Sequence, residues 1–367
     1  MTEWHEVQLG HLGRFSSGKA IKPGLEGPYQ AFGSNGVIGG STESRHERGV
    51  VVGRVGAYCG SVAVSREPFW ASDNTIVIEP AEPADLDFLY YLLLNADLNR
   101  HAGGSAQPLV TQGTLKALSF LVPDRRERQR IGQLLRVFDE LIENNRRRVE
   151  VLEEMARAIY REWFVRFRFP GHENVALVDT VLGPMPEGWE FKTVGDVLEL
   201  KYGKALKADN RARGEVAVVG SSGIVGWHDQ KLVPGPTIVV GRKGNVGSVI
   251  WIDGPCWPID TTYFVETEMP LRFVAEQLRR TEFLNTHAAV PGLGREQAYS
   301  KPFLQPPPGV LDEFQSVADS LASEGSALLS QNERVSGMRN LLLPKLVTGQ
   351  IDVSHLDLDA LVEGAVA

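Results

Sequence analysis

The sequence has few of the features that mark several large classes of protein. It contains two cysteines, Cys59 and Cys256, neither of them in a CxxC or Cys/His neighbourhood, which argues against structural disulfides and zinc. Its longest apolar run, FLYYLLL ending at Leu94, is much shorter than the roughly 20 residues of a membrane span. The first ten residues lack the apolar stretch of a secretory signal. We therefore expect a cytoplasmic protein with no membrane partner.

Catalytic motifs are also scarce. The histidines are scattered, with no HExxH and no metal-ligand spacing, so no metal site is expected. The chain lacks GxSxG and the [ND]PP[YF] tetrapeptide of amino-methyltransferases, and Gly241–Ser248 does not fit a Walker A loop. Asp73 and Asp260 occupy matching places, but an Asp beside Thr at a strand start is more often a structural cap than a nuclease ligand. The sequence predicts no catalytic residue and no cofactor.

Composition indicates a folded, soluble chain. With 43% hydrophobic and 23% charged residues it is globular, and 367 residues are about right for two domains. The formal net charge of −8 argues weakly against a nucleic-acid partner. Arginines nevertheless crowd residues 125–168, whereas the segment after Ile351 is acidic. The total charge therefore does not decide the question.

The dominant feature is a long internal repeat. Residues 51–62 read VVGRVGAYCGSV and residues 239–249 read VVGRKGNVGSV. The match extends through WxxxxxG, GKA and GSxG motifs at offsets of 185 to 188 residues. The paired positions include Trp4/Trp189, Gly18/Gly203, Lys19/Lys204, Gly53/Gly241, Arg54/Arg242, Trp70/Trp257 and Leu98–Asn99/Leu284–Asn285. So long a period indicates two copies of a whole domain.

Both copies follow the same order of predicted elements. A β-rich part with β-branched runs such as GVVVG, TIVIE, PTIVVG and SVIWI comes first. A short helix follows, at about 85–100 and 271–287, and then a Gly/Pro-bearing loop at 103–113 and 289–297. A long helix closes each copy. In the first, residues 124–168 would extend about 65 Å; Asp124 and Glu127 indicate its start and Phe169–Gly171 its end. In the second, Pro344 is expected to stop or kink the helix after Leu343.

The long helices carry a heptad pattern. In the first helix, spacings of four and three join the positions Ile131, Leu135, Phe138, Ile142, Asn145, Val149, Leu152, Ala156 and Ile159. Adding 186 predicts the second seam at Val317, Leu321, Glu324, Leu328, Gln331, Val335, Met338, Leu342 and Lys345. Asn145 and Gln331 are equivalent polar positions that would fix the helix register. Two-fold-related copies require antiparallel helices, so we expect these amides to face each other.

The predicted fold class is therefore α+β: two tandem β-rich α/β domains joined by two long antiparallel coiled-coil helices with pseudo-two-fold symmetry. The glycine-spaced phrase predicts a strand–turn–strand, with a phosphate loop as the weaker alternative. The GKAIKP and GKALKA lysines fit solvated surface or phosphate contact equally well. Trp70 and Trp257 are more often core anchors than stacking platforms. GSNG and GSSG are turns whose side chains also suit base edges.

The whole pattern resembles the specificity subunit of type I restriction–modification systems. The resemblance rests on the two WxxxxxG…GKA segments, the GSxG turns, the GR.G…GSV hairpins, PDRRERQRI, PGVLDEFQSV and the closing LLLPKLVTGQI. It implies a non-catalytic subunit whose two target recognition domains, residues 1–122 and 171–308, each read one half of a bipartite asymmetric DNA site. The helices, residues 123–170 and 309–350, would set the spacer and dock the modification subunits. An acidic tail, residues 351–367, would follow.

The partners implied by the resemblance are double-stranded DNA, two modification subunits that bring S-adenosylmethionine, and restriction subunits that bring ATP and Mg, all in a prokaryotic cytoplasm. Lys19, Lys22, Lys204 and Lys207 would contact phosphate. The candidate base readers are Ser34, Asn35, Arg54, Tyr58, Gln107 and Gln112 in copy one, and Ser221, Ser222, Arg242, Lys243, Asn245, Arg295 and Gln297 in copy two. A coiled-coil scaffold with two protein-binding heads is the alternative, and a nucleotide-dependent enzyme the third.

Overall fold

The computed structural model describes residues 3–22, 24–103, 108–181, 183–283 and 292–353. Gln107, Leu284 and Asn285, and the acidic tail from residue 354 onward, lie outside these ranges. The chain forms two compact units. Unit 1 comprises Met1–Arg147 with Leu328–Ala367, and unit 2 comprises Arg148–Ala327. The chain is of mixed α and β content, as the sequence predicts.

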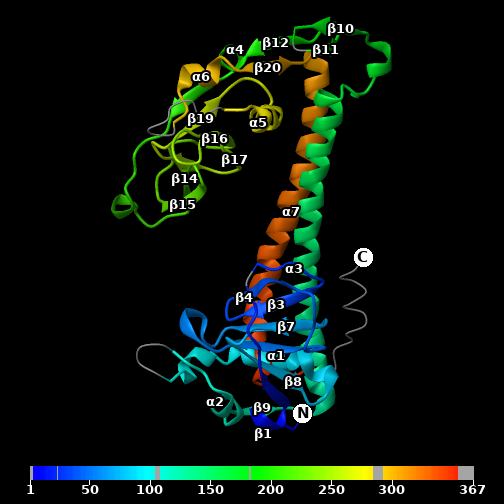
Figure 1. Ribbon diagram of the computed structural model, residues 1–367, viewed down its shortest axis with the longest axis vertical. Helices are drawn as coiled ribbons and strands as arrows, with labels where there is room; N and C mark the ends of the chain where they lie inside the picture. Colours follow the sequence, from blue (N-terminus) through cyan, green and yellow to red (C-terminus); the bar gives the residue numbers. More distant parts are fainter. Residues whose placement is uncertain (1–2, 23, 104–107, 182, 284–291, 354–367) are drawn as a thin grey trace. The chain divides into compact units, whose positions relative to one another are not determined.

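Unit 1 contains three small sheets (Figure 1). A four-stranded antiparallel sheet has the order β2 (Gly13–Ser17), β8 (Thr75–Pro80), β5 (Gly49–Gly53) and β6 (Val62–Ser65). A three-stranded sheet has the order β4 (Gly36–Ser41), β3 (Tyr29–Gly33) and β7 (Phe69–Ala71), in which β3 and β7 are parallel. The third pairs β1 (His5–Gln8) with β9 (Ser119–Val122).

Unit 2 repeats this topology strand for strand. Its four-stranded sheet has the order β13 (Glu199–Tyr202), β19 (Thr262–Glu266), β16 (Thr237–Gly241) and β17 (Val249–Ile252). Its three-stranded sheet has the order β15 (Gly223–His228), β14 (Val216–Gly220) and β18 (Cys256–Pro258), again with one parallel pair. The pair β12 (Glu190–Thr193) and β20 (Pro302–Gln305) matches β1 and β9. A hairpin of β10 (Leu177–Thr180) and β11 (Gly183–Pro186) is added.

The two glycine-spaced phrases link antiparallel neighbours, β5 to β6 and β16 to β17, so the strand–turn–strand prediction is confirmed. Close packing against the backbone explains the glycine of each GK motif. A Cβ on Gly18 would lie 1.9 Å from the carbonyl oxygen of Ser72, and one on Gly203 would lie 2.1 Å from that of Ile259. Since no side chain fits so close to another backbone, both positions require glycine. The motif that precedes each lysine is therefore set by packing.

The short helix of each unit ends earlier than the sequence predicts. α1 (Leu86–Asn95) and α5 (Leu271–Arg280) are shorter than predicted, and the expected loops end in the unpredicted helices α2 (Gln112–Lys116) and α6 (Arg295–Tyr299). Thr111 caps α2, its Oγ1 accepting a hydrogen bond of 3.0 Å from the Thr114 amide. α4 is Val194–Val197. Single 3₁₀ turns span Leu9–His11, Gly56–Tyr58, Pro83–Asp85, Leu98–His101, His172–Asn174 and Ala208–Asn210.

The first long helix, α3 (Arg125–Tyr160), continues into a π-helical turn, Arg161–Val165. The helix therefore ends before Phe169–Gly171, where the sequence predicts its end. Asp124 caps the helix as expected, accepting a 2.9 Å hydrogen bond from the Glu127 amide. The Glu127 carboxylate does not return to the cap. It is buried and accepts a 3.1 Å hydrogen bond from the Val353 amide, which fixes the end of the described chain to the start of α3.

The second long helix, α7 (Pro308–Val347), continues through Pro344, so of the predicted stop or kink after Leu343 the stop does not occur. The helix continues for one more turn, to Val347. Leu343, Leu346 and Val347 are buried, Leu346 and Val347 at 1% exposure, in a cluster with Ile131, Leu135 and Phe88. The burial of these side chains offsets the backbone hydrogen bond that proline cannot donate.

The two long helices are antiparallel within each unit. In unit 1, Arg339 pairs with Asp139 and Gln331 with Asn145. In unit 2, Arg148 lies 3.2 Å from Glu324 and the Tyr160 ring centre 6.1 Å from that of Phe314. In each unit, later residues of α3 thus meet earlier residues of α7. The predicted amide contact is present in unit 1, because Asn145 Nδ2 donates to Gln331 Oε1 at 3.0 Å. It also donates to Asn332 Oδ1 at 3.0 Å, and Asn332 Nδ2 donates to the Ile142 carbonyl at 3.1 Å.

The predicted seam of α7 needs a correction. The predicted positions Glu324, Met338 and Lys345 are exposed. Gly325, Asn332 and Leu346, each one residue beyond a predicted position, are buried. The buried amide of α7 is thus Asn332, one residue beyond Gln331. A constant offset of 186 therefore does not transfer the register of the first helix to the second, and Asn145 donates to both Gln331 and Asn332. No helix in the described ranges is long and apolar enough to cross a membrane.

We predict that Asn332→Ala lowers the stability of unit 1 by about 1–3 kcal/mol, because it removes a donor from the Ile142 carbonyl and an acceptor from the buried Asn145 amide. Urea unfolding followed by circular dichroism measures the effect. Ser330→Ala, at an exposed position of the same helix, is the control and should leave the midpoint unchanged. Equal midpoints for both variants would contradict a structural role for the amide cluster.

Candidate nucleic-acid interface

Each Gly-Lys loop is held by a tryptophan. The Trp70 indole N–H donates to the Lys19 carbonyl at 2.9 Å, and Trp257 donates to the Lys204 carbonyl at 2.9 Å. Both rings are half-buried. These tryptophans therefore act as anchors of a surface loop. Because the backbone carbonyls are fixed while the lysine side chains are exposed, each loop presents its cation at a defined place.

The GSxG turns are fixed in the same way in both units. Ser61 Oγ donates to the Ser34 carbonyl at 2.5 Å, and Ser248 Oγ donates to the Ser221 carbonyl at 2.6 Å. Ser34 Oγ also donates to the Asn74 carbonyl at 2.8 Å. Each turn is thus joined to the glycine-spaced phrase of its own unit.

The arginine of each glycine-spaced phrase is bonded through its backbone to two other loops. In unit 1 the Arg54 amide donates to Asn74 at 2.9 Å, and the Arg54 carbonyl accepts from Val110 at 3.0 Å. In unit 2 the Arg242 amide donates to Thr261 at 2.9 Å, and its carbonyl accepts from Leu293 at 2.8 Å. The matching bonds place Arg54 and Arg242 at equivalent points, between the end of a central strand and the loop before α2 or α6.

These contacts bring most sequence-predicted residues of each unit to one edge, which we call the rim of that unit. The rim of unit 1 contains Lys19, Ser34, Arg54, Tyr58 and Gln112; that of unit 2 contains Lys204, Ser221, Arg242, Lys243, Asn245 and Arg295. Lys22, Asn35, Lys207 and Ser222 are exposed and follow rim residues by one to three positions. Gln297 is half-buried in α6. Gln107 lies outside the described residues.

The rim cations differ electrostatically from those of the long helix. Within the described ranges no carboxylate forms an ion pair with Lys19, Lys22, Arg54, Lys204, Lys207, Arg242, Lys243 or Arg295. In α3, by contrast, carboxylates neutralise many arginines: Arg125 with Glu82, Arg128 with Asp85, Arg136 with Glu140, Arg148 with Glu324 and Arg157 with Glu153. The rims are therefore better suited than this helix to an anionic partner, whatever the net charge of the chain.

Sequence reasoning missed Tyr202, the last residue of β13. The guanidinium carbon of Arg295 lies 4.4 Å from the centre of its ring and that of Arg242 5.0 Å, and the Tyr263 ring centre is 5.0 Å away. A hydrogen bond from Arg295, followed by one from Tyr263, lowers the pKa of Tyr202. The only signal in the sequence was its place directly before the Gly203-Lys204 motif.

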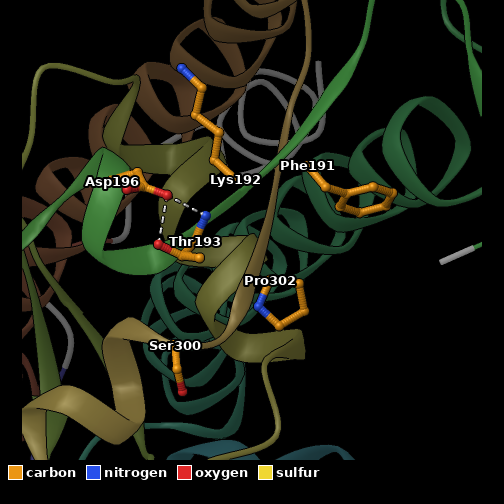
Figure 2. Close-up of a pocket in the computed structure, with 6 residues that line it drawn as sticks. All are labelled: Phe191, Lys192, Thr193, Asp196, Ser300 and Pro302. Atoms are coloured by element: carbon orange, nitrogen blue, oxygen red, sulfur yellow. Dashed lines mark hydrogen bonds between the residues drawn. The ribbon is translucent and has the colours of Figure 1, made fainter. Parts of the chain in front are cut away.

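A shallow pocket of about 560 Å³ in unit 2 is lined by residues of β12, α4 and β20 and by Ser300 (Figure 2). Figure 2 shows Asp196 beside Thr193; Asp196 Oδ2 accepts from the Thr193 amide at 2.8 Å and from its hydroxyl at 2.6 Å. The bond from the Thr193 amide is one half of the capping box of α4, and the Asp196 amide, which donates to the Thr193 side chain, supplies the other. The pocket's carboxylate therefore has a structural role.

Carboxylate and cysteine side chains are the remaining groups that could carry chemistry. No group of three or more His, Cys, Asp or Glu side chains that could hold a metal ion occurs in the described part of the chain. Asp73 and Asp260 are exposed residues of the two matching loops. Cys59 and Cys256 are buried, and burial raises the pKa of the Cys256 thiol to about 11, which leaves it protonated and unreactive at neutral pH.

Comparison with known proteins gives consistent matches. The family model described as type I restriction modification DNA specificity domain matches residues 1–154 and 186–269. The type I restriction enzyme MjaIX specificity subunit of Methanocaldococcus jannaschii is 25% identical over 335 residues, covering 81% of this chain and 76% of that protein. The EcoprrI specificity subunit of Escherichia coli is 32% identical over 114 residues, 31% of this chain and 28% of that protein.

A solved structure has a similar fold. The crystal structure of the type I restriction-modification system S subunit from M. genitalium matches with a TM-score of 0.62 at 17% identity, covering 94% of this chain and 96% of that one. At this identity the likeness concerns the fold alone.

We predict that Tyr202 ionises below the ordinary tyrosine pKa of about 10, because hydrogen bonds favour its phenolate. Replacing Arg295 with Met removes the first of those bonds and should raise the pKa. The difference in ultraviolet absorbance between each protein and its Tyr202→Phe derivative, followed against pH, isolates this one phenol. A pKa that does not move in Arg295→Met would contradict the contact.

Proposed function

Because the chain belongs to the type I restriction–modification DNA specificity family, we propose that it reads a bipartite, asymmetric DNA sequence on behalf of catalytic partner subunits. It is a specificity subunit and not an enzyme. Residues 1–122 and 171–308 are the two target recognition domains in this proposal, and each reads one half of the site. The rims of units 1 and 2 are the surfaces that meet DNA.

The observation that carries the proposal is the duplicated rim of unneutralised cations and short hydrogen-bonding side chains. Lys19, Lys22, Lys204 and Lys207 are assigned to phosphates, where they fix position without reading sequence. Arg54, Arg242 and Arg295 can form paired hydrogen bonds with a guanine edge. Serine, asparagine and glutamine side chains of the same rims can donate to or accept from other base edges.

A second domain supplies selectivity that one small domain lacks. A good bidentate base contact discriminates by only about 1–3 kcal/mol. When two domains are linked, the second binding event becomes intramolecular, so affinity and selectivity both rise without new kinds of contact. The duplicated framework with different rim residues fits two half-sites of different sequence.

We assign residues 123–170 and 309–350 to a pseudo-two-fold coiled coil that sets the spacer between half-sites and docks two modification subunits. Asn145 and Gln331, with Asn332, fix its register in this proposal. A groove of about 660 Å³ beside α3 and α7 in unit 1, lined by Asn144, Arg146, Arg147 and Ser336 among others, offers polar surface for such a partner.

The catalytic chemistry lies outside this chain. The modification subunits supply S-adenosylmethionine and flip the target adenine, restriction subunits supply ATP and Mg, and the complex works where prokaryotic DNA is found, in the cytoplasm. With a net charge of −8 the isolated chain binds DNA weakly. The complex binds tightly and loses affinity as salt rises, because bound cations release counterions from the duplex.

We predict that Arg54→Ala and Arg242→Ala each weaken DNA binding by the complex with its modification subunit about tenfold, through loss of one rim contact. Band shifts on a duplex selected from random sequence measure the effect. Arg14→Ala and Lys201→Ala are matched controls, since both cations are already paired with glutamates in the same two units. Selection of no sequence by the wild-type complex would favour the coiled-coil scaffold with protein-binding heads.

We predict that exchanging residues 172–306 for the same region of a relative changes one half of the recognised sequence and preserves the other. The reason is that each rim is built from hydrogen bonds within its own unit. Methylated adenines mapped in the host genome report both halves at once. A change in both halves would show that the domains do not read independently.

A further inference from the structure

The matching frameworks of the two units allow their rims to be compared position by position. Val110 and Leu293 make the same bond, to the carbonyls of Arg54 and Arg242 respectively. Two residues later, α2 begins with Gln112 and α6 with Arg295. These two side chains therefore occupy one structural position, although their sequence offset of 183 differs from that of the main repeat.

The strand ends are equivalent in the same sense. Ser17 ends β2 and is paired with Ile76, while Tyr202 ends β13 and is paired with Tyr263. Each directly precedes a glycine of the Gly-Lys loop, Gly18 or Gly203. Ser17 and Tyr202 thus share a second structural position, next to the first.

The two positions are in contact in both units, with different chemistry. In unit 1, Gln112 Nε2 donates to Ser17 Oγ at 2.9 Å. In unit 2, the guanidinium of Arg295 lies 4.4 Å from the Tyr202 ring. Both pairs lie beside a Gly-Lys loop and the arginine of the glycine-spaced phrase, and each short helix carries a buried residue, Leu115 or Ala298. The cross-strand partners differ, Ile76 in unit 1 and Tyr263 in unit 2.

We propose that this pair is the position at which the two domains differ in the base they read: Arg295, oriented by Tyr202, reads a guanine, and Gln112, oriented by Ser17, reads an adenine. The inference rests on the proposed function. A guanidinium edge donates two hydrogen bonds to guanine O6 and N7, and a carboxamide donates to N7 and accepts from N6 of adenine.

The observed contacts leave those groups available. Ser17 uses one hydrogen of the Gln112 amide, so the other hydrogen and Oε1 remain for adenine. The Tyr202 ring holds Arg295 and Arg242 together and leaves guanidinium N–H groups for the base. The effect of Arg295 on the pKa of Tyr202 is consistent with a close contact. Tyr202 and Ser17 are accordingly positioning residues.

The test is a reciprocal exchange in the full chain co-expressed with its modification subunit. The double variants are Gln112→Arg with Ser17→Tyr, and Arg295→Gln with Tyr202→Ser; the motif is read from methylated adenines. The first should change one base pair of one half-site from A·T to G·C, and the second should make the opposite change in the other half. Ala117→Ser, directly after α2, and Glu199→Gln, in β13, lie outside the pair and are controls that should preserve the motif.

Single variants decide the matter if a double variant fails to assemble. Arg295→Lys keeps the charge but loses the paired donors, so discrimination at one G·C position should fall about tenfold or more while the salt dependence of binding is unchanged. Tyr202→Phe keeps the ring and should largely preserve discrimination, whereas Tyr202→Ser should lose it.

Two kinds of failure are distinguishable. If the wild-type complex selects no split sequence, the proposed function itself is wrong. If it selects one but the exchanges leave every base unchanged, or alter both halves together, the assignment of this pair is overturned and the function stands.

Discussion

The structure of unit 1 depends on the pairing of α3 with α7. The buried side of this pairing is largely apolar, but at its inner end Asn145, Gln331 and Asn332 satisfy one another and the Ile142 carbonyl. Buried amides tolerate few arrangements because an unpaired one costs about 1–3 kcal/mol. The apolar cluster of Leu135, Leu343 and Leu346 and the Glu127–Val353 bond lie along the same two helices. A slip of either helix would disturb all of them.

This pairing also explains why unit 1 is not a continuous stretch of sequence. It consists of the first 147 residues and the last part of the chain from Leu328 onward, so its core is complete only when the end of α7 returns to the first repeat. Unit 2 is one stretch, Arg148–Ala327, with helical segments at both of its ends. In it Tyr160, Phe164 and Phe314 form the aromatic centre of the packing between these segments.

The frameworks are conserved between the two units, whereas the side chains on the rims differ. Tryptophan–carbonyl, serine–carbonyl and arginine–carbonyl bonds recur with nearly equal distances. These bonds use backbone acceptors, which do not constrain the exposed side chains beside them. Arg54 and Arg242 are shared, but Gln112–Ser17 is replaced by Arg295–Tyr202. A fixed backbone frame with exchangeable side chains suits two surfaces of related origin and different preference.

The sequence by itself determined the duplication, the α+β class, the strands around the glycine-spaced phrases and the position of the long helices, because repeats and hydrophobic periodicity are local patterns. It also placed most rim candidates. Only the tertiary structure decided that α7 continues past Pro344, that Asn332 is its buried amide, and that Tyr202 lies between Arg242 and Arg295. These features depend on contacts with residues that are distant in the sequence, and local patterns carry no information about such neighbours.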